Sequence, residues 1–233
     1  SMVDYQAKVT PITNQIKENI QRISKDLNKK GFRVIAVCQK NDINDITDFT
    51  VEAEKNMILL GFIGFLDPPK ESAKEAIKKL NKSGIRVIVL TGDNADVTRA
   101  VCDKVGINSK EIILGSDVEK LSDMALHRVL KKTSIFAKLS PIQKARIVRL
   151  LKMSGNVVGY MGDGINDSPS LTNSDVGISV DTAVDIAKES ADIILLEKDL
   201  QVLLDGVTEG RRTFANLIKY IKMAASFNFG EVV

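Results

Sequence analysis

Short apolar runs alternate with amphipathic stretches along most of the chain. The runs are rich in Val and Ile, and several are apolar throughout, which is typical of strands buried on both faces of a sheet. Between them, apolar residues recur at helical spacing, as at Ala73, Ala76 and Leu80. This alternation predicts an α/β fold in which helices flank a parallel sheet. Strands are expected at residues 33–38, 57–65, 85–90, 111–114, 134–137, 156–161, 176–179 and 193–196.

The N-terminal part departs from this pattern. A polar helix is expected at residues 13–29, then a strand ending near Cys38, then an Asn- and Asp-rich loop at 41–48. This segment is too short to be expected to form a hydrophobic core of its own. We therefore interpret it as the end of another domain. Two consecutive prolines, Pro68 and Pro69, follow the next strand. They restrict the backbone and remove two hydrogen-bond donors, which predicts a rigid hinge.

The C-terminal part is predicted to be one long helix, residues 199–229, whose hydrophobicity rises toward its end. Lys219 and Lys222 interrupt it, so it contains no complete membrane span of about 20 apolar residues. Two interpretations remain open: the start of a membrane helix, or a C-terminal helix surrounded by water.

Composition excludes several classes of protein. The chain of 233 residues is 44% hydrophobic and has a net charge of +3, which provides no strong attraction to nucleic acid. Cys38 and Cys102 form no CxxC pair, which disfavours a disulfide framework or a thiolate zinc site. His127 is the only histidine, so a His-pair metal site is excluded.

The first candidate for chemistry follows the strand expected at 85–90. Thr91, Gly92 and Asp93 come directly after it, and a helix is predicted from about Ala95. Ligands of open parallel sheets bind beyond the carboxyl ends of the strands, and a helix N-terminus attracts phosphate. The alternative is that Thr91 and Asp93 serve as ordinary helix caps.

A more specific motif follows the strand expected at 156–161, with the sequence GDGIND. Gly162 and Gly164 permit a tight loop, and Asp163 and Asp167 lie four residues apart around a helix start. Carboxylate oxygens suit Mg²⁺, and two carboxylates at one strand end repel each other unless a cation lies between them. The motif therefore predicts a magnesium site.

Lys144 is the candidate cation of the site. It follows Pro141, which suits the first turn of a helix that begins after the strand expected at 134–137. A lysine among carboxylates in a crevice neutralises a phosphoryl group. A lone lysine on a helix is otherwise solvated, so its role depends on its neighbours.

The order of these motifs resembles that of the haloacid-dehalogenase-like phosphotransferases, with their Rossmannoid parallel sheet flanked by helices. Within that group, several runs are similar to the phosphorylation domain of P-type ATPases: LDPPKESAKEAI, LTGDNADVTRAVCDKVGI, FAKLSPIQKARIV and MGDGINDSPSLTNSDVGISV. The continuation VDTAVDIAKESADIILLEKDL, then GRRTFANLIKYIKMAASFNFG, most resembles the bacterial magnesium-transporting P-type ATPases. The resemblance covers essentially the whole chain.

This resemblance implies roles for individual residues. Asp163 is the expected magnesium ligand with Asp167 beside it, and Asn166 is expected to contact the phosphate. The phosphoryl site would be lined by Thr91, Gly92 and Asp93, and Lys144 would stabilise the transferred group. Arg33 would reach the ATP phosphates, and Asp67 and Lys70 would belong to the interdomain hinge. The family often has arginine at the position of Lys70. An arginine binds phosphate through two parallel hydrogen bonds, and a lysine does not, so such a contact at the hinge is in doubt.

The resemblance also implies a domain organisation. We expect the C-terminal part of a nucleotide-binding domain at 1–60, the phosphorylation domain at 61–205, and a stalk helix leading into a membrane helix at 206–233. The cofactors would be Mg²⁺ and ATP. The partners would be the actuator, nucleotide-binding and membrane domains of the same polypeptide, with no nucleic acid. The chain would be the cytoplasmic portion of a bacterial inner-membrane protein.

One departure from the family is decisive for activity. No DKTG segment, which carries the phosphorylated aspartate and forms the central strand, occurs in the sequence. The chain alone is therefore expected to be inactive, and the strands ending at Leu90 and Met161 should each expose an unpaired edge. Two alternatives are a soluble phosphatase of the same superfamily, for which the required DxD motif is not found, and a non-catalytic module that binds Mg²⁺ and phosphate.

Overall fold

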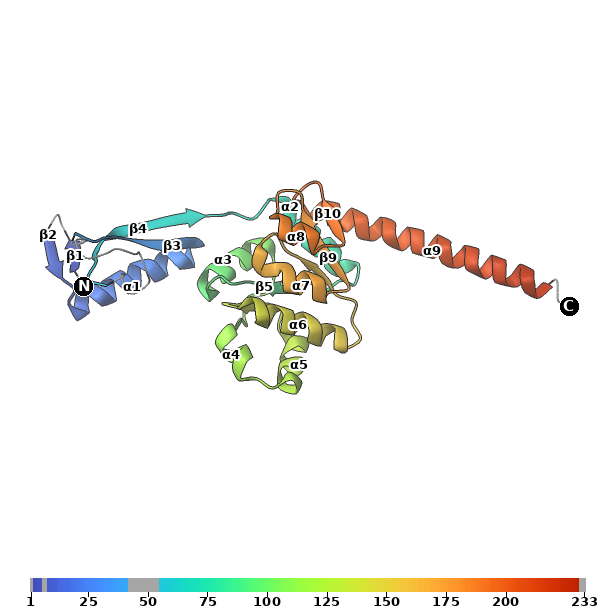
Figure 1. The fold of residues 1–233 in the computed structure, drawn as a ribbon, viewed down its shortest axis with the longest axis horizontal. Helices are drawn as coiled ribbons and strands as arrows, with labels where there is room; N and C mark the ends of the chain where they lie inside the picture. The colour runs from blue at the N-terminus through green and yellow to red at the C-terminus, as the bar shows by residue number, and fades with distance from the viewer. Residues whose placement is uncertain (1, 6–7, 42–54, 231–233) are drawn as a thin grey trace. The chain divides into compact units, whose positions relative to one another are not determined.

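The computed structural model describes residues 2–5, 8–41 and 55–230, drawn as a coloured ribbon in Figure 1. The chain forms two compact units. The first unit comprises Ser1–Pro68 and Asp93–Lys104, and the second comprises Pro69–Gly92 and Val105–Val233. The division thus falls between the two consecutive prolines of the predicted hinge. The Asn- and Asp-rich loop expected at 41–48 lies outside the described residues except for Asn41.

The first unit contains a four-stranded sheet in the order β2-β1-β4-β3. Its strands are β1 (Met2–Tyr5), β2 (Lys8–Pro11), β3 (Phe32–Gln39) and β4 (Ile58–Leu66). The sequence did not predict β1 or β2. Helix α1 (Asn14–Lys29) matches the predicted helix and begins where the Thr13 hydroxyl accepts a hydrogen bond from the backbone N–H of Ile16 at 3.3 Å. Most of α3 (Ala95–Val105) also belongs to this unit.

The second unit confirms the predicted α/β class, with parallel strands and helices around them (Figure 1). The strands form two three-stranded sheets, β5-β7-β6 and β10-β9-β8, and every pairing within them is parallel. The elements are α2 (Ser72–Lys82), β5 (Val89–Leu90), β6 (Ile113–Leu114), α4 (Gly115–Lys120), α5 (Asp123–Lys132), β7 (Ile135–Ala137), α6 (Pro141–Met153), β8 (Gly159–Met161), η2 (Ile165–Asp167), α7 (Ser168–Asn173), β9 (Val176–Val180), α8 (Asp185–Glu189), β10 (Ile193–Leu195) and α9 (Leu200–Gly230).

Strands β5 and β8 are two of the four edge strands in the sheets of the second unit. Within the described part of the chain, β5 pairs only with β7, and β8 pairs only with β9. These are the strands that end at Leu90 and Met161, for which the sequence predicts unpaired edges. Leu90 packs against the apolar clusters of both sheets, so the two halves share core contacts without sharing backbone hydrogen bonds between β5 and β8.

The hydrophobic core of the second unit consists of two clusters. One surrounds β8 and β9 and includes Tyr160 and Ile178, and the other surrounds β7 and includes Phe136. Helix α6 contributes to both, because Val148 lies in the first cluster and Ile147 in the second. Helix α6 therefore joins the two halves of the unit, and it also carries Lys144.

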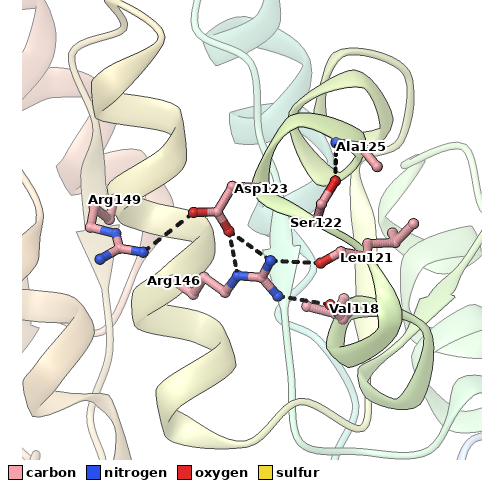
Figure 2. Close-up of polar contacts among 7 residues, drawn as sticks. All are labelled: Val118, Leu121, Ser122, Asp123, Ala125, Arg146 and Arg149. Carbon is pink, nitrogen blue, oxygen red and sulfur yellow. Dashed lines mark hydrogen bonds and ion pairs between the residues drawn. The ribbon is translucent and has the colours of Figure 1, made fainter.

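An arginine fixes α6 to the preceding helices (Figure 2). The Arg146 guanidinium donates to the backbone carbonyls of Val118 and Leu121 at the end of α4, at 2.9 and 2.7 Å. It also donates two hydrogen bonds to Asp123 Oδ1 at the start of α5, at 2.8 and 2.6 Å. Carbonyls that α4 leaves unpaired are thereby satisfied, and the three helices are held in one arrangement.

Helix α9 fulfils the prediction of a long C-terminal helix, with 31 residues. Arg211 donates to the backbone carbonyl of Ser83 at 2.8 Å, and α9 packs against α2. Beyond Arg211 the helix carries exposed apolar side chains. None of the described helices is both long and apolar enough to cross a membrane. The assignment of residues 206–233 to a stalk and membrane helix stays a prediction.

Candidate functional site

The GDGIND loop begins where β8 ends and turns directly into the short helix η2. At Gly162 a Cβ atom would lie 2.5 Å from Cβ of Asp167 and 3.0 Å from its Oδ2 atom. No side chain fits there, so this glycine is required for the Asp167 side chain to fold back over the loop. The carboxylate therefore lies against the loop backbone instead of extending into solvent.

Asp167 and Lys144, both predicted from the sequence, are in contact. Lys144 Nζ lies 2.8 Å from Asp167 Oδ1, and the two side chains are only 13% and 14% exposed. Burial by itself raises the pKa of the Asp167 carboxyl. Hydrogen bonds from Lys144 and Tyr160, the Lys144 charge and the Gly164 amide outweigh that effect and leave the pKa below its ordinary value.

Tyr160 is a third member of this group that the sequence did not identify. Its hydroxyl donates to Asp167 Oδ1 at 2.7 Å, while its ring belongs to the apolar cluster around β8 and β9. Burial, followed by the hydrogen bond to Asp167 and the charge of that carboxylate, raises the pKa of the Tyr160 phenol far above its ordinary value. The phenol therefore keeps its proton and acts as a donor. The only signal in the sequence is its position, two residues before Gly162.

Asp163 has a different environment. Its Oδ2 atom lies 2.6 Å from Nζ of Lys198, which is placed between β10 and α9, and both side chains are more than half exposed. Each carboxylate of the loop thus has its own lysine. Repulsion between the carboxylates therefore does not by itself require a metal ion, because the lysines also supply compensating charge. The assignment of Asp163 and Asp167 as magnesium ligands stays a prediction.

The donor atoms of the loop nevertheless fit a hard cation. Asp163 offers a solvent-accessible carboxylate, and Asp167 Oδ2 makes a long contact of 3.4 Å with the Gly164 amide. Mg²⁺ keeps several waters and needs one or two protein carboxylates, which this loop supplies. The part of the chain that the structure describes contains no group of three or more His, Cys, Asp or Glu residues able to hold a metal on protein ligands alone.

Thr91 and Gly92 follow β5 as predicted. The backbone N–H of Thr91 donates to the carbonyl of Phe136, and its own carbonyl accepts from the N–H of Leu139, both at 3.0 Å. At Gly92 a Cβ atom would lie 3.6 Å from the Leu139 carbonyl oxygen. The loop after β5 is thus held against the loop after β7, which leads into the helix of Lys144.

Asp93 belongs to the first unit, where it pairs with Arg33. The distance from Arg33 Nη2 to Asp93 Oδ1 is 2.7 Å, although the two residues are 60 positions apart. The helix that follows is capped by Asn94, whose Oδ1 accepts from the N–H of Val97 at 3.0 Å. Asn94, the residue after Asp93, therefore provides a cap for this helix.

The remaining predicted residues are on the surface. Asn166 lies exposed in η2, and Asp67 is exposed at the end of the first unit. Lys70 begins the second unit close to Asp199, where its charge contributes to a lowered pKa of the Asp199 carboxyl, after hydrogen bonds from the Gln201 amide and Ser72. The roles expected for these residues stay predictions. Lys198, like Tyr160, was not predicted, because nothing in the local sequence relates it to Asp163.

Comparison with known proteins supports the resemblance noted from the motifs. The chain is 52% identical over 232 residues to "Magnesium-transporting ATPase, P-type 1" of Escherichia coli strain K12 and 51% identical to the protein of that name in Salmonella typhimurium. Each match covers 100% of this chain and 26% of the relative. It is also 33% identical over 229 residues to "Calcium-transporting ATPase 1" of Bacillus cereus.

Solved structures and family models agree with these relatives. The crystal structure of a zinc-transporting PIB-type ATPase in the E2.Pi state matches with a TM-score of 0.58 at 25% identity, covering 87% of this chain and 26% of that one. This chain therefore spans about a quarter of the length of the proteins that it matches. Residues 8–175 match the model of the haloacid dehalogenase-like hydrolases. The parallel sheets and the contact between Lys144 and Asp167 agree with this match. The chain belongs to the haloacid dehalogenase-like hydrolase family.

Proposed function

We propose that this chain is part of a cation-transporting P-type ATPase, and that the transported cation is Mg²⁺. The observation that carries the proposal is the partly buried Lys144–Asp167 pair at the carboxyl end of β8, within a chain that is 52% identical along its length to a magnesium-transporting relative. In this role, the second unit stabilises a phosphoryl group during its transfer to and from an aspartate. That reaction depends mainly on positioning and on neutralisation of charge.

Each residue of the proposed phosphoryl site in the second unit has its own role. Asp163 holds Mg²⁺, which supplies positive charge next to the phosphoryl oxygens. Lys144 neutralises a further phosphoryl oxygen, while Thr91 and Gly92 donate hydrogen bonds from the loop after β5. Asn166 contacts the phosphate from the exposed surface of η2. Asp167 positions the Lys144 ammonium through their direct contact.

The first unit is proposed to supply contacts to ATP. Arg33 is assigned to the ATP phosphates, and its bond to Asp93 orients the guanidinium. The attacking aspartate, on a DKTG segment, is proposed to lie in another part of the same polypeptide, together with the actuator and membrane domains. The chain described here would then occupy the cytoplasmic side of a bacterial inner membrane.

Magnesium binding by the 233-residue chain tests the site. Titration with Mg²⁺ should shift the backbone NMR signals of Gly162 and Gly164, and Asp163→Ala should abolish those shifts. Asp185→Ala is the matched control, because Asp185 is 90% exposed on α8 and pairs only locally with Lys188. Shifts that survive in the Asp163 variant, or that vanish equally in the control, would contradict the assignment.

Phosphorylation tests the proposed division between this chain and the rest of the polypeptide. Asp93, Asp163 and Asp167 are proposed as partners of the phosphate or the metal and not as the attacking group. The chain incubated with Mg²⁺ and radiolabelled ATP should retain no label after acid precipitation. Stoichiometric labelling would place the nucleophile within this chain.

A strand supplied from outside tests the sheet. A synthetic peptide containing the Asp-Lys-Thr-Gly-Thr strand should pair with the edges of β5 and β8 and raise the melting temperature of the chain. A scrambled peptide of the same composition should leave it unchanged. Equal effects of the two peptides would show that β5 and β8 do not accept this strand.

A further inference from the structure

Asp167 receives two donors on one oxygen atom. Lys144 Nζ and the Tyr160 hydroxyl lie 2.8 and 2.7 Å from Oδ1, and they come from different elements, α6 and β8. The other oxygen, Oδ2, accepts a long hydrogen bond of 3.4 Å from the Gly164 amide. A single donor would suffice to orient the carboxylate, so the second donor requires an explanation.

The proposed function supplies a conflict that a second donor resolves. Lys144 has to neutralise a phosphoryl group, but it is also the ionic partner of a carboxylate that is only 14% exposed. If the ammonium left Asp167 for the phosphoryl group, a largely buried negative charge would lose its partner, which is costly. A donor that never leaves offsets part of that cost.

Tyr160 has the properties of such a permanent donor. Its side chain is 8% exposed, and its ring packs among buried residues of β9, α7 and α8, such as Ile178, Leu171 and Ala187. The strand and this packing fix the position of the hydroxyl, whereas a lysine side chain has four rotatable bonds and moves easily. A phenylalanine would fill the same apolar space but would lack the hydroxyl, so the bond to Asp167 depends on having tyrosine at this position.

We propose that Tyr160 is a positioning residue that holds the Asp167 carboxylate permanently, so that Lys144 is free to be shared between Asp167 and the phosphoryl group. The proposal rests on the proposed function for the phosphoryl role of Lys144. It adds Tyr160 to the site. In this proposal, Oδ1 of Asp167 holds the carboxylate in place, and Oδ2 remains for the loop and its cation.

A double-mutant cycle on the 233-residue chain tests whether the two donors support the same charge. Urea unfolding is compared for the wild type, Tyr160→Phe, Lys144→Met and the double variant. Either donor alone keeps Asp167 paired. The factor by which the double variant raises the unfolding equilibrium constant should therefore exceed the product of the factors for the two single variants by about tenfold. Tyr220→Phe is the matched control, because Tyr220 is 64% exposed on α9, and its effect should simply multiply with that of Lys144→Met. Multiplicative effects for Tyr160 as well would overturn the proposal.

A second measurement addresses the sharing of Lys144. Inorganic phosphate is titrated in the presence of Mg²⁺, and the side-chain NMR signal of Lys144 is followed together with the Gly92 amide. In the wild type both signals should move. In Tyr160→Phe the lysine should stay on Asp167, so the midpoint for Lys144 should rise by about tenfold, while Tyr220→Phe behaves as the wild type.

The outcomes separate this inference from the proposed function. If phosphate moves neither Lys144 nor Gly92 in the wild type, the phosphoryl site itself is wrong, and the sharing role fails with it. If the wild type responds and Tyr160→Phe has the same midpoint, the site stands and the role of Tyr160 is refuted. A raised midpoint in Tyr160→Phe, with unchanged methyl signals from the core around β9, supports the positioning role over general loss of structure.

Discussion

Strand β4 of the first unit is as apolar in sequence as the parallel strands of the second unit, but the two sheets bury their side chains very differently. In β7 the side chains of Ile135, Phe136 and Ala137 are 0% exposed. In the antiparallel pair of β3 and β4, Ile35 and Ile63 are 53% and 50% exposed. Apolar composition therefore does not indicate how deeply a strand is buried.

The difference follows from what covers each sheet. Helices lie on the sheets of the second unit, and both of the molecule's described clusters of buried apolar side chains form there. In the first unit α1 packs against β3, and every residue of β3 and β4 remains at least partly exposed. Close packing on both faces makes the second unit the rigid support on which a site of fixed geometry depends.

The largest effect should come from the core of the second unit. Phe136→Ala removes a fully buried aromatic side chain and leaves a cavity, so it should lower the free energy of unfolding by about 3–5 kcal/mol. Urea unfolding followed by circular dichroism measures this. A loss below about 1 kcal/mol would show that the cluster around β7 can repack freely and that the contrast between the sheets is overstated.

A smaller but more local effect is expected at the GDGIND loop. In Gly162→Ala the new methyl group would overlap the Asp167 side chain, so stability should fall by about 1–3 kcal/mol. Gly61→Ala in β4 is the control, because nothing lies within 4 Å of the added atom. The NMR signal of the Lys144 ammonium should change only in the Gly162 variant. Equal losses in the two variants would mean that the loop does not hold Asp167 as described.

The exposed sheet of the first unit should tolerate truncation. Ile63→Ala removes apolar atoms from a side chain that is half exposed, so the free energy of unfolding should change by less than about 1 kcal/mol. Thermal unfolding of the variant beside Phe136→Ala gives the direct contrast. A loss as large as that of Phe136→Ala would mean that β4 is covered in solution.

The smallest effect concerns acid sensitivity in the second unit. A hydrogen bond from the Val158 amide at 2.9 Å, and then Lys152, lower the pKa of the Asp175 carboxyl. The stabilisation that this carboxylate provides is present above its ordinary pKa and is lost as the pH falls through the lowered value. When the pH is lowered from 5 to about 3, the melting temperature of the wild type should therefore fall slightly more than that of Asp175→Asn. Parallel pH profiles would refute this contribution.

Agreement between prediction and structure was best where the signal is local. Periodicity identified α1, α2 and α9 and the region of each strand from β3 to β10, and Pro141 marked the first residue of α6. Strand lengths were predicted less well. Residues 85–90 read as one strand, but only Val89 and Leu90 pair, because pairing depends on a neighbouring strand as well as on the residues themselves.

The site shows the same division. The order of the motifs brought Lys144 and Asp167 into one hypothesis, and the two side chains meet although the strands before them, β7 and β8, belong to different sheets. It did not find Lys198, which is 35 positions from Asp163, or the bond between Arg33 and Asp93 across 60 positions. Strands β1 and β2 were also missed, since four-residue segments carry too little periodicity to be recognised.

By itself the sequence determined the α/β class, the order of the strands from β3 onward, the glycine-bounded acidic loop and the family, because these follow from local patterns and from motifs of fixed spacing. Only the tertiary structure decided which side chains are buried and which charges meet. Tyr160 is an apolar-run residue in the sequence, and it becomes a donor to Asp167 only because β8, α6 and η2 converge on one point. Contacts between distant segments depend on how helices and strands pack, and no short stretch of sequence contains that information.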